Sequence, residues 1–249
     1  MTPAPDTTIT ARNLDSYSTP WGVEHYIQQE GLWTIEQQLV SEFMPAPPAT
    51  MLDIGCGAGR TTVGLARLGY DVIAIDLAEA LLVHARRRFP AFDFRTMDAT
   101  ALSFADASFD AALFSYNGID CIFPVAARQR CLLETFRVLK PGGTFICSSH
   151  NFVGAIFSGG YWYLRGYFNA LRTLVQQRRN PYLRDWYVRY DDPSGTQFLY
   201  SAPPGRTVDQ LQGAGFIVVD VRGATGQRQP GRVRRREQHV YFVARKPPS

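Results

Sequence analysis

The apolar positions of this chain follow two rhythms. From residue 49 onward, short apolar runs typical of buried strands alternate with segments whose apolar residues recur every three or four positions, as on one face of a helix. The strands expected first are T-M-L-D-I (50–54), D-V-I-A-I-D (71–76), F-D-F-R-T-M-D (92–98), F-D-A-A-L-F-S (109–115) and T-F-I-C-S-S-H (144–150). Strands that alternate with helices over short connections predict a parallel sheet covered by helices.

Turn and stop signals bound the expected helices. One helix over 59–70 ends at Gly69, a second over 78–90 ends at Pro90, and a third from Val125 to Leu139 ends at the turn K-P-G-G. The chain between 151 and 200 breaks the rhythm with many aromatic residues, a helical segment over 167–179 and an extended stretch, Q-F-L-Y-S. A helix over 207–215 and two strands, F-I-V-V-D-V and H-V-Y-F-V-A-R, are expected last.

Composition narrows the class of protein. With 249 residues, 45% of them hydrophobic and 19% charged, the chain can bury a full core as one α/β domain. It has neither the run of about 18 apolar residues of a membrane span nor the order of a signal peptide, so we expect a cytoplasmic protein. The four cysteines form no C-x-x-C pair, which favours reduced thiols over a zinc site or a disulfide framework.

The positive charge is modest but concentrated. The net charge is +4, and six arginines fall between 222 and 236 in R-G-A-T-G-Q-R-Q-P-G-R-V-R-R-R. This segment is either a solvated loop between the last two strands, the interpretation we favour, or a patch for an acidic substrate or partner.

The stretch M-L-D-I-G-C-G-A-G-R-T-T (51–62) carries the most specific chemical signal. Gly55, Gly57 and Gly59 follow a strand and precede a helix, so the backbone can approach a ligand beside free N–H groups. A dinucleotide fingerprint requires a third glycine where Arg60 stands, and the lysine of a nucleotide triphosphate loop is absent. Asp53 would repel a pyrophosphate and favours a ligand with a cationic amine.

With this loop, the chain resembles the class I S-adenosylmethionine (SAM) dependent methyltransferases. The resemblance covers residues 49–150, and more loosely the last helix and strands. It also rests on the acidic residue at the end of the second strand and on three further motifs, which occur in the family's order and spacing. These motifs are M-D-A-T, F-D-A-A-L-F-S-Y-N and R-V-L-K-P-G-G-T-F. It implies an α/β fold with a doubly wound, mostly parallel seven-stranded sheet. The parts it implies are an N-terminal helical cover (1–48), a SAM-binding core (49–150), an aromatic insertion or lid (151–200), and the final core elements (201–249).

The resemblance also implies roles for residues in the core. Asp76 would bind the ribose hydroxyls, Leu77 would pack on adenine, Asp98 would accept from the adenine amino group, and the Ala99 N–H would reach the ring. The loop residues Asp53, Gly55, Gly57 and Gly59, together with Arg60 and Ser115, would hold the methionine part. Helix capping by Asp98, a turn at Asp76 and a solvated Arg60 are the structural alternatives.

Candidates for the chemistry follow the fourth and fifth strands, because ligands bind at the carboxyl ends of strands in open α/β sheets. His150 is the candidate general base, since its ordinary pKa lies near neutrality, and Tyr116 and Asn117 are the other catalytic candidates. A loop histidine bonded to the backbone and a turn-capping Asn117 are the alternatives. Aromatic residues of the cover and insertion suit an apolar or cationic acceptor, with Tyr17, Trp21, Tyr161 and Trp186 as candidate substrate contacts.

These signals predict a methyltransferase that uses SAM and acts on a small molecule, with no metal and no membrane partner. One alternative within the same fold uses SAM itself as substrate, by cyclisation or by transfer of its aminocarboxypropyl arm. Another is a nucleic-acid methyltransferase, which the missing N-P-P-Y or D-P-P-Y sequence disfavours. A SAM-binding partner subunit without activity of its own is the last.

Overall fold

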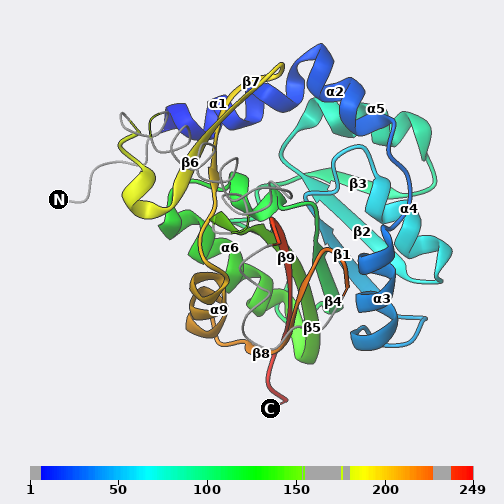
Figure 1. Cartoon of the computed structure of the whole chain (residues 1–249). Coiled ribbons are helices and arrows are strands. Elements are labelled where there is room, and N and C mark those ends of the chain that lie inside the picture. The colour runs from blue at the N-terminus through cyan, green and yellow to red at the C-terminus, as the bar shows by residue number, and fades with distance from the viewer. Residues whose placement is uncertain (1–6, 153, 155–174, 176–179, 227–236, 249) are drawn as a thin grey trace.

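Helices cover both faces of a central sheet in this computed structural model, which describes residues 7–152, 154, 175, 180–226 and 237–248 (Figure 1). The strands of the sheet are β1 (Thr50–Ile54), β2 (Asp71–Asp76), β3 (Asp93–Thr96), β4 (Phe109–Phe114), β5 (Leu139–His150), β8 (Ile217–Gly223) and β9 (His239–Arg245). The helices are α1 (Thr7–Ser18), α2 (Pro20–Ile27), α3 (Thr34–Phe43), α4 (Arg60–Arg67), α5 (Glu79–Arg88), α6 (Val125–Val138) and α9 (Pro204–Gly213), with short 3-10 helices η1 (Gly118–Cys121) and η2 (Leu183–Asp185).

The sheet has the order β3-β2-β1-β4-β5-β9-β8. Pairing is parallel from β3 to β5, and β9 runs antiparallel between β5 and β8. The strands that carry the cofactor motifs are thus neighbours, and their carboxyl ends meet at one edge. The predicted doubly wound, mostly parallel seven-stranded sheet is confirmed.

Alternate side chains of the central strands serve two separate cores. Met51 and Leu113 pack with α3 and α4 on one face, while Leu52 and Phe114 pack with α6 and α9 on the other. Because β1 and β4 are covered on both sides, their sequences are apolar apart from Thr50, Asp53 and Asp110. Helix α3 therefore belongs to the core layers, although its residues fall within the segment predicted as cover.

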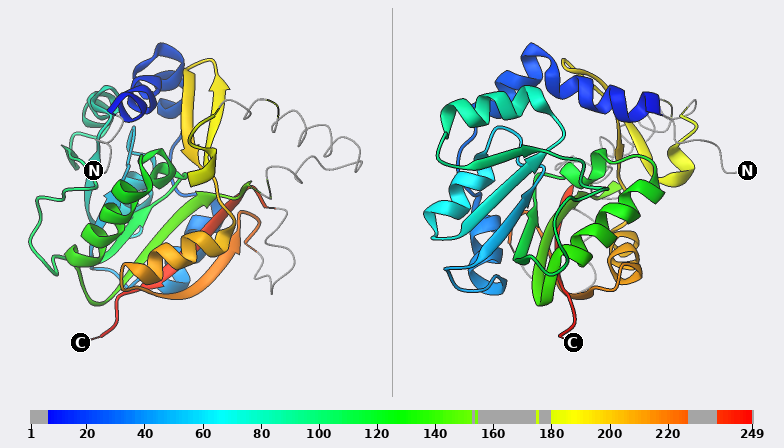
Figure 2. Two further views of the ribbon diagram at one scale, coloured as in Figure 1. Left: turned by 90° about the vertical axis from the view of Figure 1, so that its left-hand side faces the viewer. Right: turned by 180° about the vertical axis from the view of Figure 1, so that it is seen from behind.

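Helix α1 and a separate β-hairpin lie side by side above the carboxyl edge of the sheet (Figure 2). The hairpin pairs β6 (Tyr187–Asp192) with β7 (Gly195–Tyr200). Asn13 of α1 fastens the two together, because its Nδ2 donates to the carbonyl of Phe198 at 2.8 Å and its Oδ1 accepts from the Phe198 N–H at 2.8 Å. The cover is thus built from parts of the chain that are more than 180 residues apart, since Asn13 and Phe198 are separated by 185 positions.

Three expectations need correction. The strand predicted from Thr144 begins at Leu139, so K-P-G-G lies within β5, where the pairing with β4 shifts register. The stretch Q-F-L-Y-S is extended as predicted, but the chain before it forms β6 rather than irregular structure. Arg222 is buried and paired with Glu42 and Asp220, so it does not belong to a solvated loop.

Other expectations have mixed outcomes. The four cysteines are free thiols, as predicted. The other arginines of the late segment and most of the helical segment over 167–179 lie outside the described residues. Among the residues that are described, no helix is both long and apolar enough to cross a membrane.

Candidate active site

A cavity of about 520 Å³ lies at the carboxyl ends of β1, β2 and β4, beneath α1 and α2. The predicted site residues that line it are Tyr17, Gly55, Gly57, Arg60, Asp76, Leu77, Asp98, Ala99, Ser115 and Tyr116. The structure therefore brings together residues chosen from four separate motifs and from the N-terminal segment. Asp53, Gly59, Asn117, His150, Trp21 and Trp186 do not line it, and Tyr161 lies outside the described residues.

Asp76 connects the end of β2 to the glycine loop. Its Oδ2 accepts from the N–H of Gly57 at 2.7 Å, and its Oδ1 accepts from the N–H of Ala78 at 2.7 Å. Burial raises the pKa of Asp76, although these backbone donors oppose the shift. Each carboxylate oxygen has a second lone pair, so the group can still accept from two hydroxyls of a ligand. Leu77, next in the chain, lines the cavity and is 41% exposed.

The glycine loop needs residues without a side chain. Gly55 has φ +66°, and a Cβ there would lie 2.5 Å from the ring of Phe114. Gly59 has φ +89°, and a Cβ there would lie 3.0 Å from the ring of Phe94. These close approaches explain why Gly59 shapes the loop without lining the cavity.

Asp53 lies behind the loop in the core. Its Oδ2 accepts from the hydroxyls of Thr61 at 2.7 Å and Thr62 at 2.6 Å, which fixes the start of α4, while its Oδ1 is buried without a hydrogen-bond partner among the described residues. Burial raises the pKa of Asp53 to about 6, against the hydrogen bonds from the two threonines. The side chain does not reach the cavity wall, so its predicted contact with an amine would be indirect.

Arg60 is already engaged in a buried ion pair. Its Nη1 and Nη2 donate to the two carboxylate oxygens of Glu36 at 2.7 and 2.8 Å, and Nη1 also donates to the carbonyl of Gly31 at 2.9 Å. Although burial opposes the shift, the ion pair with Glu36 raises the pKa of Arg60. Both terminal nitrogens thus hold the chain after α2 onto the core, and the predicted pairing with the methionine carboxylate would compete with Glu36.

Aromatic side chains form the wall contributed by the cover. Tyr116 adopts φ +52°, a strained backbone for a residue with a side chain, and its ring meets the edges of Trp33 and Tyr26 with centroids 4.8 and 5.6 Å apart. The Tyr116 hydroxyl lies 3.1 Å from Nε2 of His25, and the Tyr17 hydroxyl lies 2.9 Å from the Cys121 sulfur. Burial raises the pKa of Tyr17, so its phenol stays protonated.

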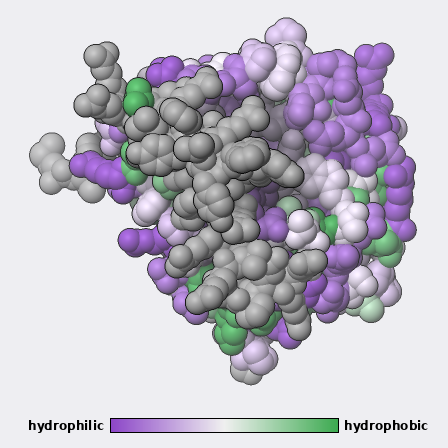
Figure 3. All heavy atoms as spheres, in the orientation of Figure 1, coloured by the Kyte–Doolittle hydropathy of each residue, from purple (hydrophilic) through white to green (hydrophobic). Residues whose placement is uncertain are grey.

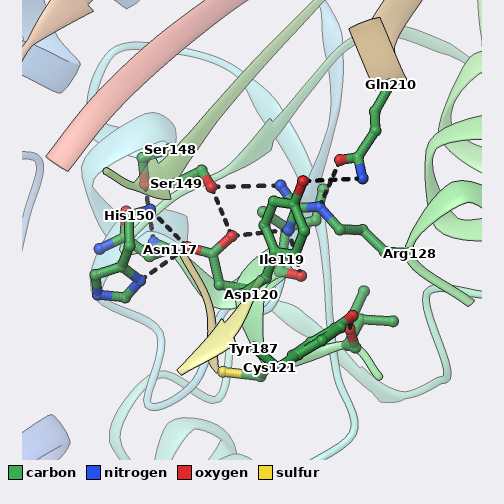
Figure 4. A network of polar contacts seen from close by, with 12 residues as sticks. Asn117, Ile119, Asp120, Cys121, Arg128, Ser148, Ser149, His150, Tyr187 and Gln210 are labelled. Carbon is green, nitrogen blue, oxygen red and sulfur yellow. Dashed lines mark hydrogen bonds and ion pairs between the residues drawn. The ribbon is translucent and has the colours of Figure 1, made fainter. Parts of the chain in front are cut away.

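His150 belongs to a buried polar network on η1 and the end of β5 (Figure 4). The carboxylate of Asp120 lies between His150 and Arg128: its Oδ2 accepts from the His150 backbone N–H at 2.7 Å and lies 2.8 Å from His150 Nδ1, and its Oδ1 accepts from Arg128 Nη1 at 2.7 Å. Asp120 and Arg128 are fully buried. This arrangement favours the tautomer with the proton on Nδ1 and leaves Nε2 as the basic nitrogen of His150.

Asn117 joins the same network from the left-handed region, at φ +57°. Its Nδ2 lies 2.6 Å from Nδ1 of His239, and its backbone N–H donates to the hydroxyl of Ser148 at 2.8 Å. Burial lowers the pKa of His239 to about 4, with the neighbouring His150 as the second cause, so His239 is neutral at physiological pH.

Two of the aromatic candidates pack elsewhere. Trp21 stacks on His25 at the surface with 44% of its area exposed. Trp186 follows η2 and packs against Phe152 with ring centroids 6.2 Å apart.

Sequence reasoning missed several residues of this region. The cavity wall also includes Thr10, Asn13, Leu14, Tyr26, Gln29, Cys121, Ile122, Phe123 and Arg130. Glu36 carried a readable signal, because it shares the apolar helix face of Ile35, Leu39 and Val40. The residues of α1 carried none, since only the folded cover decides which of its side chains point inward. Within the described residues, no group of three or more His, Cys, Asp or Glu could hold a metal.

Comparison with known proteins agrees with this geometry. Residues 51–143 match the family described as methyltransferase domain. The demethylmenaquinone methyltransferase of Clavibacter sepedonicus is 32% identical over 187 residues, which cover 73% of this chain and 71% of that protein. The chain belongs to the class I SAM-dependent methyltransferase family. SAM is the methyl donor of this family, and the predicted fold, family and cofactor class are confirmed.

Two further relatives of this chain carry quinone-related names. The demethylmenaquinone methyltransferase of Renibacterium salmoninarum is 34% identical, with 55% of this chain and 56% of the relative covered. The ubiquinone biosynthesis O-methyltransferase of Cereibacter sphaeroides is 35% identical, with 53% and 58% covered. The chain spans between half and three-fifths of the length of the first such relatives.

Solved structures show the same fold. A SAM-dependent methyltransferase of Methanosarcina mazei superposes with a TM-score of 0.65 at 22% identity, covering 88% of this chain and 100% of that one. At this identity the likeness concerns the fold alone.

Proposed function

We propose that this methyltransferase transfers the methyl group of SAM to a small aromatic molecule. The observation that carries the proposal is the cavity, which joins the cofactor motifs of β1 to β4 to an aromatic wall from α1, α2 and the chain after η1. The names of its relatives point to demethylmenaquinone and a ubiquinone precursor as acceptors of those proteins. A phenol or quinol is accordingly the acceptor class that we propose for this chain.

The residues present fit the cofactor. In this proposal, Asp76 accepts from the ribose hydroxyls and Leu77 packs on the adenine. The Ala99 N–H reaches the adenine ring, and Asp98 accepts from its amino group. Asp98 already accepts from the N–H of Thr100 at 2.7 Å through Oδ1, and its Oδ2 can accept from a second donor. When bound, the sulfonium of SAM supplies an electrophilic methyl group, so the protein needs mainly to align the acceptor and to take a proton from it where the chemistry requires.

The three catalytic candidates differ in their access to the acceptor. Tyr116 lines the cavity, and its hydroxyl lies beside His25, which is exposed and can pass a proton to solvent. His150 and Asn117 lie in the network around Asp120 and do not line the cavity. We therefore favour Tyr116 as the contact to the acceptor, and keep His150 and Asn117 as candidates that support the loop after β4.

The test is product analysis. The purified chain is incubated with SAM and with simple phenols, catechols and reduced naphthoquinones, and the products are identified by mass spectrometry. We expect S-adenosylhomocysteine together with an acceptor that has gained one methyl group. Release of methylthioadenosine instead would overturn methyl transfer in favour of cyclisation or arm transfer, and absence of SAM binding would overturn the proposal as a whole.

A further inference from the structure

We propose that Gln29 selects the cofactor by its amine: the side-chain amide oxygen accepts a hydrogen bond from the ammonium group of the methionine part of SAM. This inference rests on the proposed function, because it concerns the same cavity. It adds a residue of the N-terminal cover to a cofactor site otherwise built from the core.

The first observation is an unused acceptor. Gln29 lines the cavity, and its Oε1 is buried without any hydrogen-bond partner among the described residues. Its Nε2 lies 3.4 Å from the carbonyl oxygen of His25. Because a carbonyl can only accept, this contact places the NH₂ group toward His25 and leaves the oxygen as the free end. A buried amide oxygen without a donor is costly, so the site favours a ligand that supplies one.

The second observation is where Gln29 lies in the cavity. Two residues later, Gly31 is joined to Arg60 twice: its N–H donates to the Arg60 carbonyl at 3.1 Å, and its carbonyl accepts from Arg60 Nη1 at 2.9 Å. A Cβ on Gly64 would lie 2.7 Å from the side chain of Leu32, so this chain segment packs closely against α4. Gln29 is therefore held beside the start of α4, where Arg60 and Thr61 line the cavity, whereas Leu77 and Asp98 mark the adenosine end.

The third step is the choice of ligand group. The methionine part of SAM ends in a carboxylate, which a carbonyl oxygen repels, and an ammonium, which it attracts and accepts from. The charges of Arg60 and Glu36 neutralise each other beside this site. Asp53 lies behind the loop, and its Oδ1 is another buried acceptor without a hydrogen-bond partner within the described part of the chain, so its charge adds to the preference for a cation here without direct contact.

Binding measurements with two ligands test the inference without knowledge of the acceptor. The ligands are S-adenosylhomocysteine and its desamino analogue, which lacks only the amine, and affinities are measured by calorimetry. Methionine is close to glutamine in shape but lacks the amide oxygen. Gln29→Met is therefore expected to weaken the binding of S-adenosylhomocysteine by about tenfold, because a hydrogen bond to a charged group is lost, and to leave the affinity for the desamino analogue unchanged. Gln29→Glu keeps the acceptor and is expected to keep the preference for the amine.

The matched control is Gln28→Met. Gln28 is the exposed neighbour, and its Nε2 donates to Glu24 at 2.6 Å, so both affinities should stay at the wild-type values. Equal weakening of both ligands by Gln29→Met, or no weakening of either, would overturn the role of Gln29. Failure of the wild-type chain to bind either ligand would instead overturn the proposed function.

Discussion

The two ends of the cavity are built in different ways. The end that we propose for adenosine comes from one continuous part of the chain, in which Asp76, Leu77 and Asp98 follow neighbouring strands. The acceptor end joins α1 and α2 to the chain after β4, so that Tyr17 meets Cys121 across 104 positions of sequence. Local motifs therefore define the first end, and long-range packing defines the second.

The buried ion pair between Glu36 of α3 and Arg60 of α4 lies beside the cavity, and breaking it should have the largest effect on the stability of the fold. Glu36→Gln keeps the shape of the side chain but leaves a buried guanidinium without its counter-charge, since 0% of the Glu36 side chain and 8% of the Arg60 side chain are exposed. We expect a loss of about 3–5 kcal/mol in the free energy of unfolding, measured by urea denaturation.

A double variant separates the charge from the packing. Glu36→Leu combined with Arg60→Met removes both charges and should recover much of the loss, because apolar residues of similar volume can replace a buried pair. A loss below about 1 kcal/mol for Glu36→Gln would show that the pair behaves like an exposed one and does not hold α3 to α4.

Within the core, Asp53 should give the protein a pH-dependent stability. Its pKa of about 6 in the folded state lies above the ordinary value, because of burial, so folding favours its protonated form. This contribution is fully present below about pH 4 and is lost as the pH rises through about 6, an effect on the order of 3 kcal/mol. Asp53→Asn cannot ionise, and its amide oxygen can still accept from Thr61 and Thr62.

The measurement is the unfolding free energy of wild type and Asp53→Asn at pH 4, 5.5 and 7. We expect the stability of the wild type to fall relative to the variant as the pH rises, since other titrating groups act on both proteins alike. Parallel curves would mean that Asp53 has the same pKa in the folded and unfolded states, with the two threonine hydroxyls offsetting its burial.

The contrast between the two ends also explains how far the sequence could be read. Asp76 and Asp98 were predictable, because each follows a short strand whose neighbours are set by parallel order. Trp21 was not, since helical spacing says that an aromatic residue lies on a face but not that the face points away from the cavity. Gln29 gave no signal at all, because the role that we propose for it depends on Gly31 meeting Arg60 in the folded chain.

A substitution at the adenosine end should act on every ligand that contains adenosine. Asp98→Asn keeps the oxygen that accepts from Thr100 and turns an NH₂ group toward the adenine amino group, so an acceptor is lost. We expect S-adenosylhomocysteine and its desamino analogue to weaken alike, by about tenfold, which is about 1.4 kcal/mol. Calorimetry with both ligands gives the comparison with Gln29, whose replacement should affect one ligand only.

Asp93→Asn is the control for this variant, because Asp93 is exposed and paired with Arg95 outside the cavity. Its affinities for both ligands should equal those of the wild type. If Asp98→Asn weakened the binding of only one of the two ligands, Asp98 would lie at the methionine end, and the proposed division of the cavity would be wrong.

The smallest effect is expected where the cover meets the core at the surface. There Glu30 bridges Arg67 of α4 and Arg88 of α5, and the described surface around α2 and α5 is largely hydrophilic (Figure 3). Since the Glu30 side chain is 32% exposed and its partners more so, solvent screens the charges, and Glu30→Gln should cost no more than about 1 kcal/mol in the free energy of unfolding. Added salt should shrink that cost further, as it does for exposed pairs, while leaving the cost of Glu36→Gln nearly unchanged. If urea denaturation showed the same salt dependence for Glu30→Gln and Glu36→Gln, the distinction between a surface ion pair and a buried one would be contradicted. Glu36 and Glu30 are both carboxylates paired with arginine, and burial is the difference that makes the first ion pair one that the fold requires and the second one that it tolerates losing.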